Sequence, residues 1–155
     1  SSRNWSGPWP HRSASEPMRQ IASLVLFALP LLSLGQAGLQ VVMLLEKPAL
    51  AGTLRVALCA SRKAYNSGMG CIEGSVPVNA SSATCDFPGL APGTYAVKVF
   101  QDVDDDGLLD TSWLGWPTEP VGYSNDAPIN TGTPPFGSAA IALGPGRHTA
   151  RIRVR

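Results

Sequence analysis

Apolar and polar residues alternate along several short segments of the chain, and this two-residue period is typical of β-strands with one buried face. The clearest segment is residues 53–59. There Leu54, Val56 and Leu58 share one face, and Arg55 belongs to the other. Seven such segments, separated by turn residues, predict seven strands over residues 39–45, 53–59, 75–78, 83–87, 94–100, 138–143 and 148–154.

Glycine and proline punctuate these segments. The chain contains 16 glycines and 14 prolines, which favours many short elements joined by turns over long helices. Residues 46–52 predict a turn that joins the first two strands as a hairpin, and residues 144–147 predict the turn of a final hairpin. The pattern as a whole predicts an all-β fold, an antiparallel β-sandwich of about seven strands.

The N-terminal part of the chain has a different character. Residues 1–17 precede Met18, a plausible initiator, and resemble a tag or an upstream extension. Residues 18–37 have a basic start, an apolar stretch and a small-residue end, which is the pattern of a cleavable signal peptide. The stretch at 21–34 is shorter than the roughly 20 apolar residues of a membrane-spanning helix. We therefore expect cleavage, leaving residues 38–155 as a single β-sandwich domain of a periplasmic or secreted protein.

Charge narrows the class of partner. The formal net charge is +1 and only 15% of the residues are charged, so the chain lacks the basic surface that nucleic-acid binding requires. Signal cleavage would also leave no stable membrane span. The partner that the sequence predicts is an envelope protein or a glycan.

A run of aspartates opens the long stretch between Phe100 and Ser138, which has no strand periodicity. Counted from Asp102, carboxylates fall at positions 1, 3, 5 and 9 and glycine at position 6, as in loops that wrap oxygen ligands around calcium. Position 12, which in such loops is a bidentate glutamate, is Trp113 here. Glu119 or Asp126, later in the chain, could supply the missing ligand, and spacing does not choose between them. The predicted calcium ligands are Asp102, Asp104, Asp106, the carbonyl of Leu108, and Asp110. The alternative is a solvated acidic turn.

Aromatic residues are concentrated in the same long stretch. Trp113, Trp116 and Tyr123 could stack on sugar rings or anchor a partner if they are exposed on a rigid β scaffold. The alternative is that they pack against the sandwich, as the aromatics of long loops commonly do.

Three cysteines in a chain with an export signal predict one disulfide and one remaining thiol. Cys85 shares strand parity with Phe87 and is expected to face the core, which favours Cys59 and Cys71 as the pair. Residues 38–155 contain a single histidine, His148, and no CxxC motif. A zinc site and acid–base catalysis are therefore disfavoured, and we expect a protein that is not an enzyme.

Several ordered motifs resemble a known family. They are residues 90–102 (LAPGTYAVKVFQD), 104–110, 114–117, Glu119, 122–127, 134–136 and 139–140. With them the chain resembles, from about Leu39 to its C-terminus, the bacterial exported proteins known as domain of unknown function 2141. The resemblance implies a prealbumin-like or immunoglobulin-like sandwich in a bacterial envelope. It also implies that Cys59 and Cys71 pair, and that Asp104 and Asp106, where members usually carry Asn, strengthen cation binding.

The segment from Pro92 to Tyr95 is also similar to transthyretin-like domains, one branch of which hydrolyses a purine-derived ring. That branch uses several histidines and a Tyr-Arg-Gly-Ser ending, whereas this chain has His148 and ends in Arg155. A small transthyretin-like hydrolase is therefore the third interpretation. The second is a carbohydrate-binding module, and the first is an exported binding or structural module with a calcium-stabilised loop.

Overall fold

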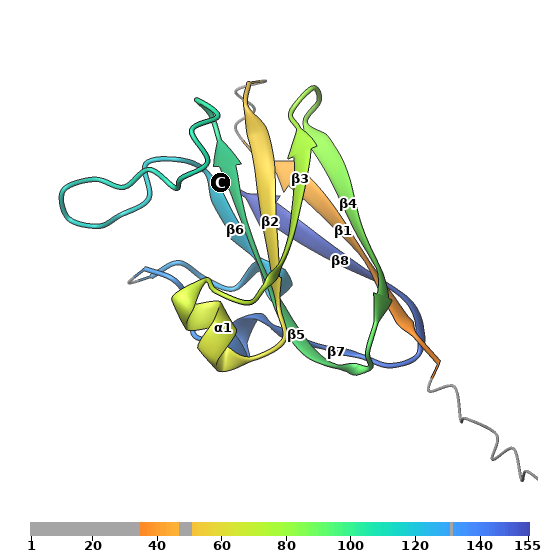
Figure 1. Ribbon diagram of the computed structural model, residues 1–155. Helices are drawn as coiled ribbons and strands as arrows, with labels where there is room; N and C mark the ends of the chain where they lie inside the picture. The colour runs from red at the N-terminus through yellow and green to blue at the C-terminus, as the bar shows by residue number, and fades with distance from the viewer. Residues whose placement is uncertain (1–34, 47–50, 131) are drawn as a thin grey trace, which may run out of the picture. The chain divides into compact units, whose positions relative to one another are not determined.

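The computed structural model describes residues 35–46, 51–130 and 132–155. Within them eight strands form two sheets, and the predicted all-β sandwich is confirmed (Figure 1). The extension and most of the predicted signal segment, residues 1–34, lie outside the described residues. The elements are β1 (Ala37–Leu45), β2 (Thr53–Cys59), α1 (Arg62–Ser67), β3 (Ile72–Pro77), β4 (Ser82–Leu90), β5 (Gly93–Asp102), β6 (Val121–Tyr123), the 3₁₀ turn η1 (Ser124–Asp126), α2 (Phe136–Ala139), β7 (Ala140–Leu143) and β8 (Gly146–Val154).

One sheet has three strands in the order β4-β1-β8. β1 pairs antiparallel with β4 and parallel with β8, so the first and last strands of the domain lie side by side. The other sheet has the order β3-β2-β5-β6, with β7 also paired to β5. β7 and β6 share one edge of β5, the former along residues 93–96 and the latter along residues 98–100.

Both predicted hairpins at the ends of the domain are wrong. β1 and β2 belong to different sheets, and so do β7 and β8. Turn residues between two alternating segments do not distinguish a hairpin within one sheet from a connection that crosses between two sheets. In a sandwich, both arrangements direct the apolar faces toward the same core.

The core lies between the two sheets and follows the strand alternation. In β1, every second residue from Ala37 to Leu45 is less than a tenth exposed. β2 contributes Leu54, Val56 and Leu58 from the opposite side. Burial of these side chains stabilises the fold by roughly 1.5–3 kcal/mol each. The same alternation leaves Arg55 and its neighbours of equal parity on the outer face of the five-stranded sheet.

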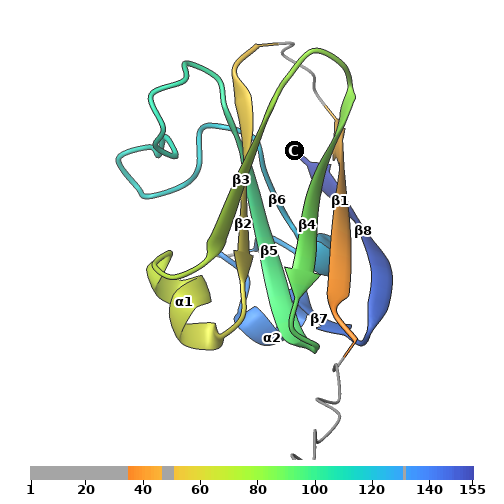
Figure 2. The same cartoon turned by 45° about the vertical axis from the view of Figure 1, so that its right-hand side comes forward.

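A second, smaller cluster covers part of that outer face. Its buried members include Cys59, Tyr65 of α1, Tyr123 and Ala139. Figure 2 shows α1 and the acidic loop on the same outer side of the sheet. No helix within the described residues is long and apolar enough to cross a membrane.

Two short helices and one short strand were not predicted. α1 begins after Ser61, whose hydroxyl accepts a hydrogen bond from the N–H of Ala64, and it ends at Gly68 with φ of +72°. A serine N-cap and a glycine at the C-terminal end are recognisable signals. The predicted strand 138–143 is helical up to Ala139 and extended only from Ala140. The missed strand, β6, has only three residues, too few for a visible period.

Candidate functional site

The candidate site begins at the last residue of β5. Asp102 has no exposed surface, and the Nε of Arg55, on the neighbouring strand β2, donates to its Oδ2 at 2.6 Å. Burial acts to raise the pKa of the Asp102 carboxyl, but hydrogen bonds from Arg55 and from two backbone N–H groups outweigh it, so the pKa lies below its ordinary value. Asp102 is therefore ionised at neutral pH and fixes the Arg55 side chain.

The chain after Asp102 turns back over this carboxylate. The N–H of Asp106 donates to Oδ1 at 3.1 Å, and the N–H of Gly107 donates to Oδ2 at 2.9 Å. Asp105 and Gly107 have φ of +60° and +87°, a region that aspartate tolerates and glycine adopts freely. The glycine at position 6 thus allows the loop to fold around Asp102.

Three of the predicted calcium ligands come together. One carboxylate oxygen from each of Asp102, Asp104 and Asp106 lies within 4.8 Å of the others. Oδ1 of Asp104 accepts from the N–H of Asp106 at 3.3 Å, and Oδ1 of Asp106 accepts from the N–H of Leu108 at 2.7 Å. Within the described residues, Asp110 is not a member of this group.

The two candidate late ligands lie in different surroundings. Glu119 is 8% exposed, and its Oε1 accepts from the N–H of Val103 at 2.7 Å while its Oε2 accepts from the N–H of Asp110 at 3.1 Å. Glu119 therefore ties the two ends of the acidic loop together. Asp126 instead accepts hydrogen bonds from Arg153 of β8, at 2.9 Å.

Residues 110–118 form a small hairpin that continues the loop. The N–H of Thr118 donates to the carbonyl of Asp110 at 2.9 Å, and the N–H of Gly115 donates to the carbonyl of Ser112 at 2.8 Å. Trp113 and Leu114 occupy the tip between these bonds and are 91% and 62% exposed. Backbone hydrogen bonds thus hold an exposed tryptophan at the end of a defined turn.

The three aromatics of the predicted sugar platform do not act together. Trp116 is 44% exposed and lies on the same hairpin as Trp113. Tyr123 is only 5% exposed, packs in the second cluster, and donates its hydroxyl to Oγ1 of Thr133 at 3.4 Å. Any platform is therefore limited to the two tryptophans.

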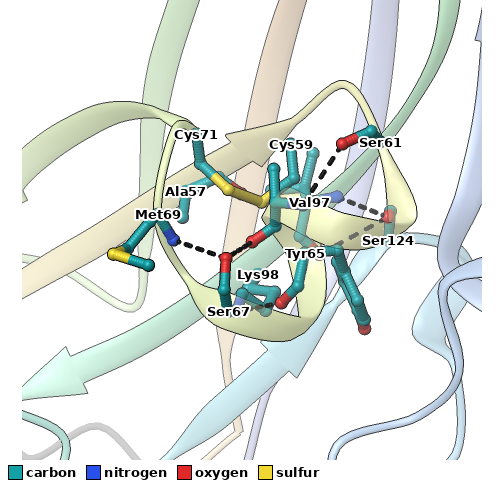
Figure 3. Close-up of a disulfide and its surroundings, with 11 residues drawn as sticks. Ala57, Cys59, Ser61, Tyr65, Ser67, Met69, Cys71, Val97, Lys98 and Ser124 are labelled. Carbon is teal, nitrogen blue, oxygen red and sulfur yellow. Dashed lines mark hydrogen bonds between the residues drawn. A yellow bond between two sulfur atoms is a disulfide. The ribbon is translucent and has the colours of Figure 1, made fainter.

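A disulfide joins Cys59 at the end of β2 to Cys71 just before β3, across a sequence separation of 12 (Figure 3). It encloses α1, so the helix is held against the outer face of the sheet. Cys85 is a buried free thiol. Next to the disulfide, Nζ of Lys98 donates to the carbonyl of Tyr65 at 2.7 Å and lies 5.1 Å from the centre of its ring.

Sequence reasoning missed two cations, Arg55 next to the loop and Lys98 next to α1, which line a groove on the outer face of the sheet. Strand parity had placed Arg55 on that face, but nothing in the sequence linked it to Asp102, 47 residues away. His148, which the hydrolase interpretation requires as a base, has its Nε2 2.9 Å from the carbonyl oxygen of Gly144.

Comparison with known proteins places the chain in a family. Residues 47–151 match the family described as "Uncharacterized protein conserved in bacteria (DUF2141)". The chain belongs to this bacterial family. Its matched region runs from the connection before β2 into β8, and so includes the acidic loop, the disulfide and the groove. No curated protein and no solved structure matches the chain.

Proposed function

We propose that this family member is an exported β-sandwich binding module whose acidic loop holds a calcium ion. The observation that carries the proposal is the approach of three carboxylates, those of Asp102, Asp104 and Asp106, to within 4.8 Å. Two oxygens bound to the same calcium ion lie at most about 5 Å apart, because each calcium–oxygen distance is about 2.3–2.6 Å. The cluster is therefore of a size that suits calcium.

The charge balance supports a cation at this position. Arg55 offsets one of the three carboxylates through Oδ2 of Asp102. Within the described loop, Oδ1 of Asp102 accepts one hydrogen bond, from the N–H of Asp106, which leaves it a further lone pair. Asp104 and Asp106 are exposed and can turn toward an ion. Calcium would supply the positive charge that the loop lacks, and the carbonyl of Leu108 and the carboxylate of Asp110 are the remaining proposed ligands.

Thermal unfolding with chelator and then with millimolar calcium tests the proposal. The missing bidentate glutamate predicts a weak site, with a dissociation constant on the order of 10⁻⁴ to 10⁻³ M. At ten times that constant, calcium should stabilise the protein by about 1.4 kcal/mol, visible as a higher melting temperature. Superimposed curves, together with no heat of binding in calorimetry, would refute the calcium site.

A matched pair of variants assigns the effect to the loop. Asp106→Asn removes charge from a member of the cluster and should reduce the calcium-dependent shift. Asp105→Asn removes the same charge one position away, outside the cluster, and asparagine tolerates the φ of +60° found there. Equal losses in the two variants would point to general charge screening instead of a defined site.

Export is the second part of the proposal. The Cys59–Cys71 disulfide supports it, because disulfides persist mainly in oxidising compartments, and the signal-like segment 18–37 supports it as well. We expect the chain recovered outside the cytoplasm of a bacterial host to begin at Gly38. Cleavage there would remove one residue of β1, Ala37, which pairs with Leu90 and Gly146. An intact mass that retains residues 21–34 would mean an anchored protein.

A carbohydrate-binding module is the second candidate, favoured by the exposure of Trp113 at the hairpin tip. Ring stacking on a sugar would involve Trp113 and Trp116. A glycan array on the full chain, repeated with Trp113→Ala, tests it. We expect any sugar signal to be lost in the variant, and a signal that survives would exclude the tip as the sugar contact.

A further inference from the structure

The outer face of the five-stranded sheet carries a groove of about 440 Å³. This volume lies in the range of roughly 300–1,000 Å³ that is common for small-molecule sites. Its floor consists of two neighbouring rows of residues, and the members of each row are cross-strand neighbours on β3, β2, β5 and β6. One row is Ser75, Arg55, Phe100 and Val121; the other is Glu73, Ala57, Lys98 and Tyr123.

The walls of the groove come from segments far apart in the sequence. Gly68, after α1, stands on one side, and Gly107 and Leu109 of the acidic loop stand on the other, with Thr133 from the segment before α2. Figure 2 shows α1 and the loop rising from the same side of the sheet. The end of α1 and the acidic loop therefore both contribute to the walls of the groove.

Arg55 is fixed with part of its guanidinium directed to the groove. Its Nε is held by Oδ2 of the fully buried Asp102, and its side chain is 37% exposed. Among the described residues, no hydrogen-bond acceptor contacts its two Nη groups. Nη2 lies next to the loop, 3.7 Å from where a Cβ would stand on Gly107. An arginine that is oriented by one buried carboxylate while two donor groups remain available is prepared to bind an anion.

Lys98 adds a second cation. It lies diagonally from Arg55 on the same face, because Arg55 pairs with Phe100 and Lys98 is two residues away along β5. Within the described part of the chain it forms no ion pair, and its Nζ bonds the carbonyl of Tyr65. The single carboxylate that lines the groove belongs to Glu73, which is exposed on the edge strand β3. Because Asp102 already offsets Arg55, Lys98 balances Glu73, and the two Nη groups of Arg55 remain as donors in the groove.

We propose that this groove binds a small organic anion that carries a flat apolar group. The carboxylate or phosphate of the ligand is held by the Nη groups of Arg55, with Lys98 contributing charge. The apolar group lies on Phe100, which is directly across from Arg55 and two residues from Lys98, and against Leu109 of the acidic loop. The anion contacts of this site come from residues of the sheet, and Leu109 of the acidic loop forms part of its wall.

Nuclear magnetic resonance titration of the full-length protein with benzoate and with phenyl phosphate tests the site, and benzyl alcohol serves as the uncharged control. We expect both anions to shift the amide signals of residues 55–57, 73–75 and 98–100, and benzyl alcohol to bind at least about tenfold more weakly. Preference between the two anions identifies the acidic group of the ligand. Equal binding of benzyl alcohol, or shifts spread over both sheets, would overturn the proposal.

Two variants separate the anion contact from the fold. Arg55→Lys keeps a positive charge beside Asp102 but loses the planar donor fork, and we expect roughly tenfold weaker binding of benzoate. Arg147→Gln removes an exposed charge from β8, in the other sheet, and should leave affinity unchanged. If Arg55→Lys fails to fold, Lys98→Met provides the same comparison. It removes the charge but keeps an apolar side chain, and we expect a smaller loss of benzoate affinity. Wild-type affinity in a folded Arg55→Lys variant would refute the assignment, and repeating the titration with chelator shows whether calcium contributes.

Discussion

The carboxylate of Asp126 accepts two hydrogen bonds from Arg153, one from the backbone N–H and one from Nε, both at 2.9 Å. These bonds join η1, at the end of the long loop region, to the last strand. Burial acts to raise the pKa of Asp126, but the bonds and the charge of Arg153, with that of Arg155, outweigh it, so the pKa lies below its ordinary value.

A depressed pKa in the folded state makes the stability depend on pH. The contribution of Asp126 is fully present above the ordinary pKa of aspartate and is lost as the pH falls through the lower pKa of the folded state. We expect Asp126→Asn to lower the denaturation midpoint at pH 7 and to converge with the wild type in strong acid. Asp86→Asn, which removes an exposed charge from β4, is the control. A constant difference between wild type and Asp126→Asn at every pH would contradict the role of ionisation.

The disulfide between Cys59 and Cys71 should be a major source of stability. A closed loop of this length constrains the unfolded chain by about 3 kcal/mol in the chain-entropy model. Replacing both cysteines by serine should therefore lower the free energy of unfolding by about that amount, as measured by denaturant titration. A loss well below 1 kcal/mol would mean that the helix α1 is held by its packing alone.

The same cysteines predict a labelling pattern. Burial, with a smaller effect of Asp86, raises the pKa of the Cys85 thiol, so the reactive thiolate is scarce. Peptide mapping without reduction should yield the Cys59–Cys71 link, with Cys85 alkylated only after unfolding. Rapid alkylation of Cys85 in the native protein would show that β4 opens readily.

Most of what could be predicted about the fold followed from the alternation of apolar and polar residues in the strands. It placed Leu54, Val56 and Leu58 in the core and Cys85 on a buried face. It could not assign strands to sheets, because partners are chosen by contacts between distant segments. The parallel pairing of β1 with β8 is such a choice: nothing local distinguishes it from a hairpin with β2.

In the candidate site, too, the residues that depend on local spacing could be predicted and those that depend on distant contacts could not. Spacing alone identified Asp102, Asp104 and Asp106, since a turn with glycine at position 6 brings nearby carboxylates together. Arg55 and Lys98 could not be found this way, because their roles come from cross-strand neighbours. Of the three loop aromatics, Tyr123 follows the alternative of packing against the sandwich: it belongs to β6, a strand of three residues that is too short to show a period, and it is buried.

Gly74 marks a close approach between β3 and β4. A Cβ at this position would stand 2.6 Å from Sγ of Cys85 and 3.2 Å from Cζ of Phe87. Gly74→Ala should therefore destabilise the protein by roughly 1–3 kcal/mol through overpacking. Removing the sulfur with Cys85→Ala should relieve part of that loss, so the double variant is expected to be more stable than the sum of the single changes implies. Strict additivity in denaturant titration would show that the clash lies elsewhere.

Ser124 provides the sharpest test of how η1 is attached to the sheet. Its side chain is fully buried, its Oγ accepts the N–H of Val97 in β5 at 2.9 Å, and it donates to the carbonyl of Ala139 at the end of α2. Ser124→Ala removes little volume but leaves a buried N–H and a buried carbonyl without partners. An unsatisfied buried polar group costs about 1–3 kcal/mol.

We therefore expect Ser124→Ala to lower the free energy of unfolding by at least about 1 kcal/mol. Ser124→Thr keeps the hydroxyl, so any stability that it loses should come from overpacking by the extra methyl group. Amide hydrogen exchange distinguishes the two causes. In Ser124→Ala the N–H of Val97 should exchange much faster than its neighbours in β5, whereas in Ser124→Thr its protection should change only with global stability. Unchanged protection of Val97 in Ser124→Ala would mean that a water molecule replaces the hydroxyl, and that the attachment of η1 depends on packing of the second cluster instead.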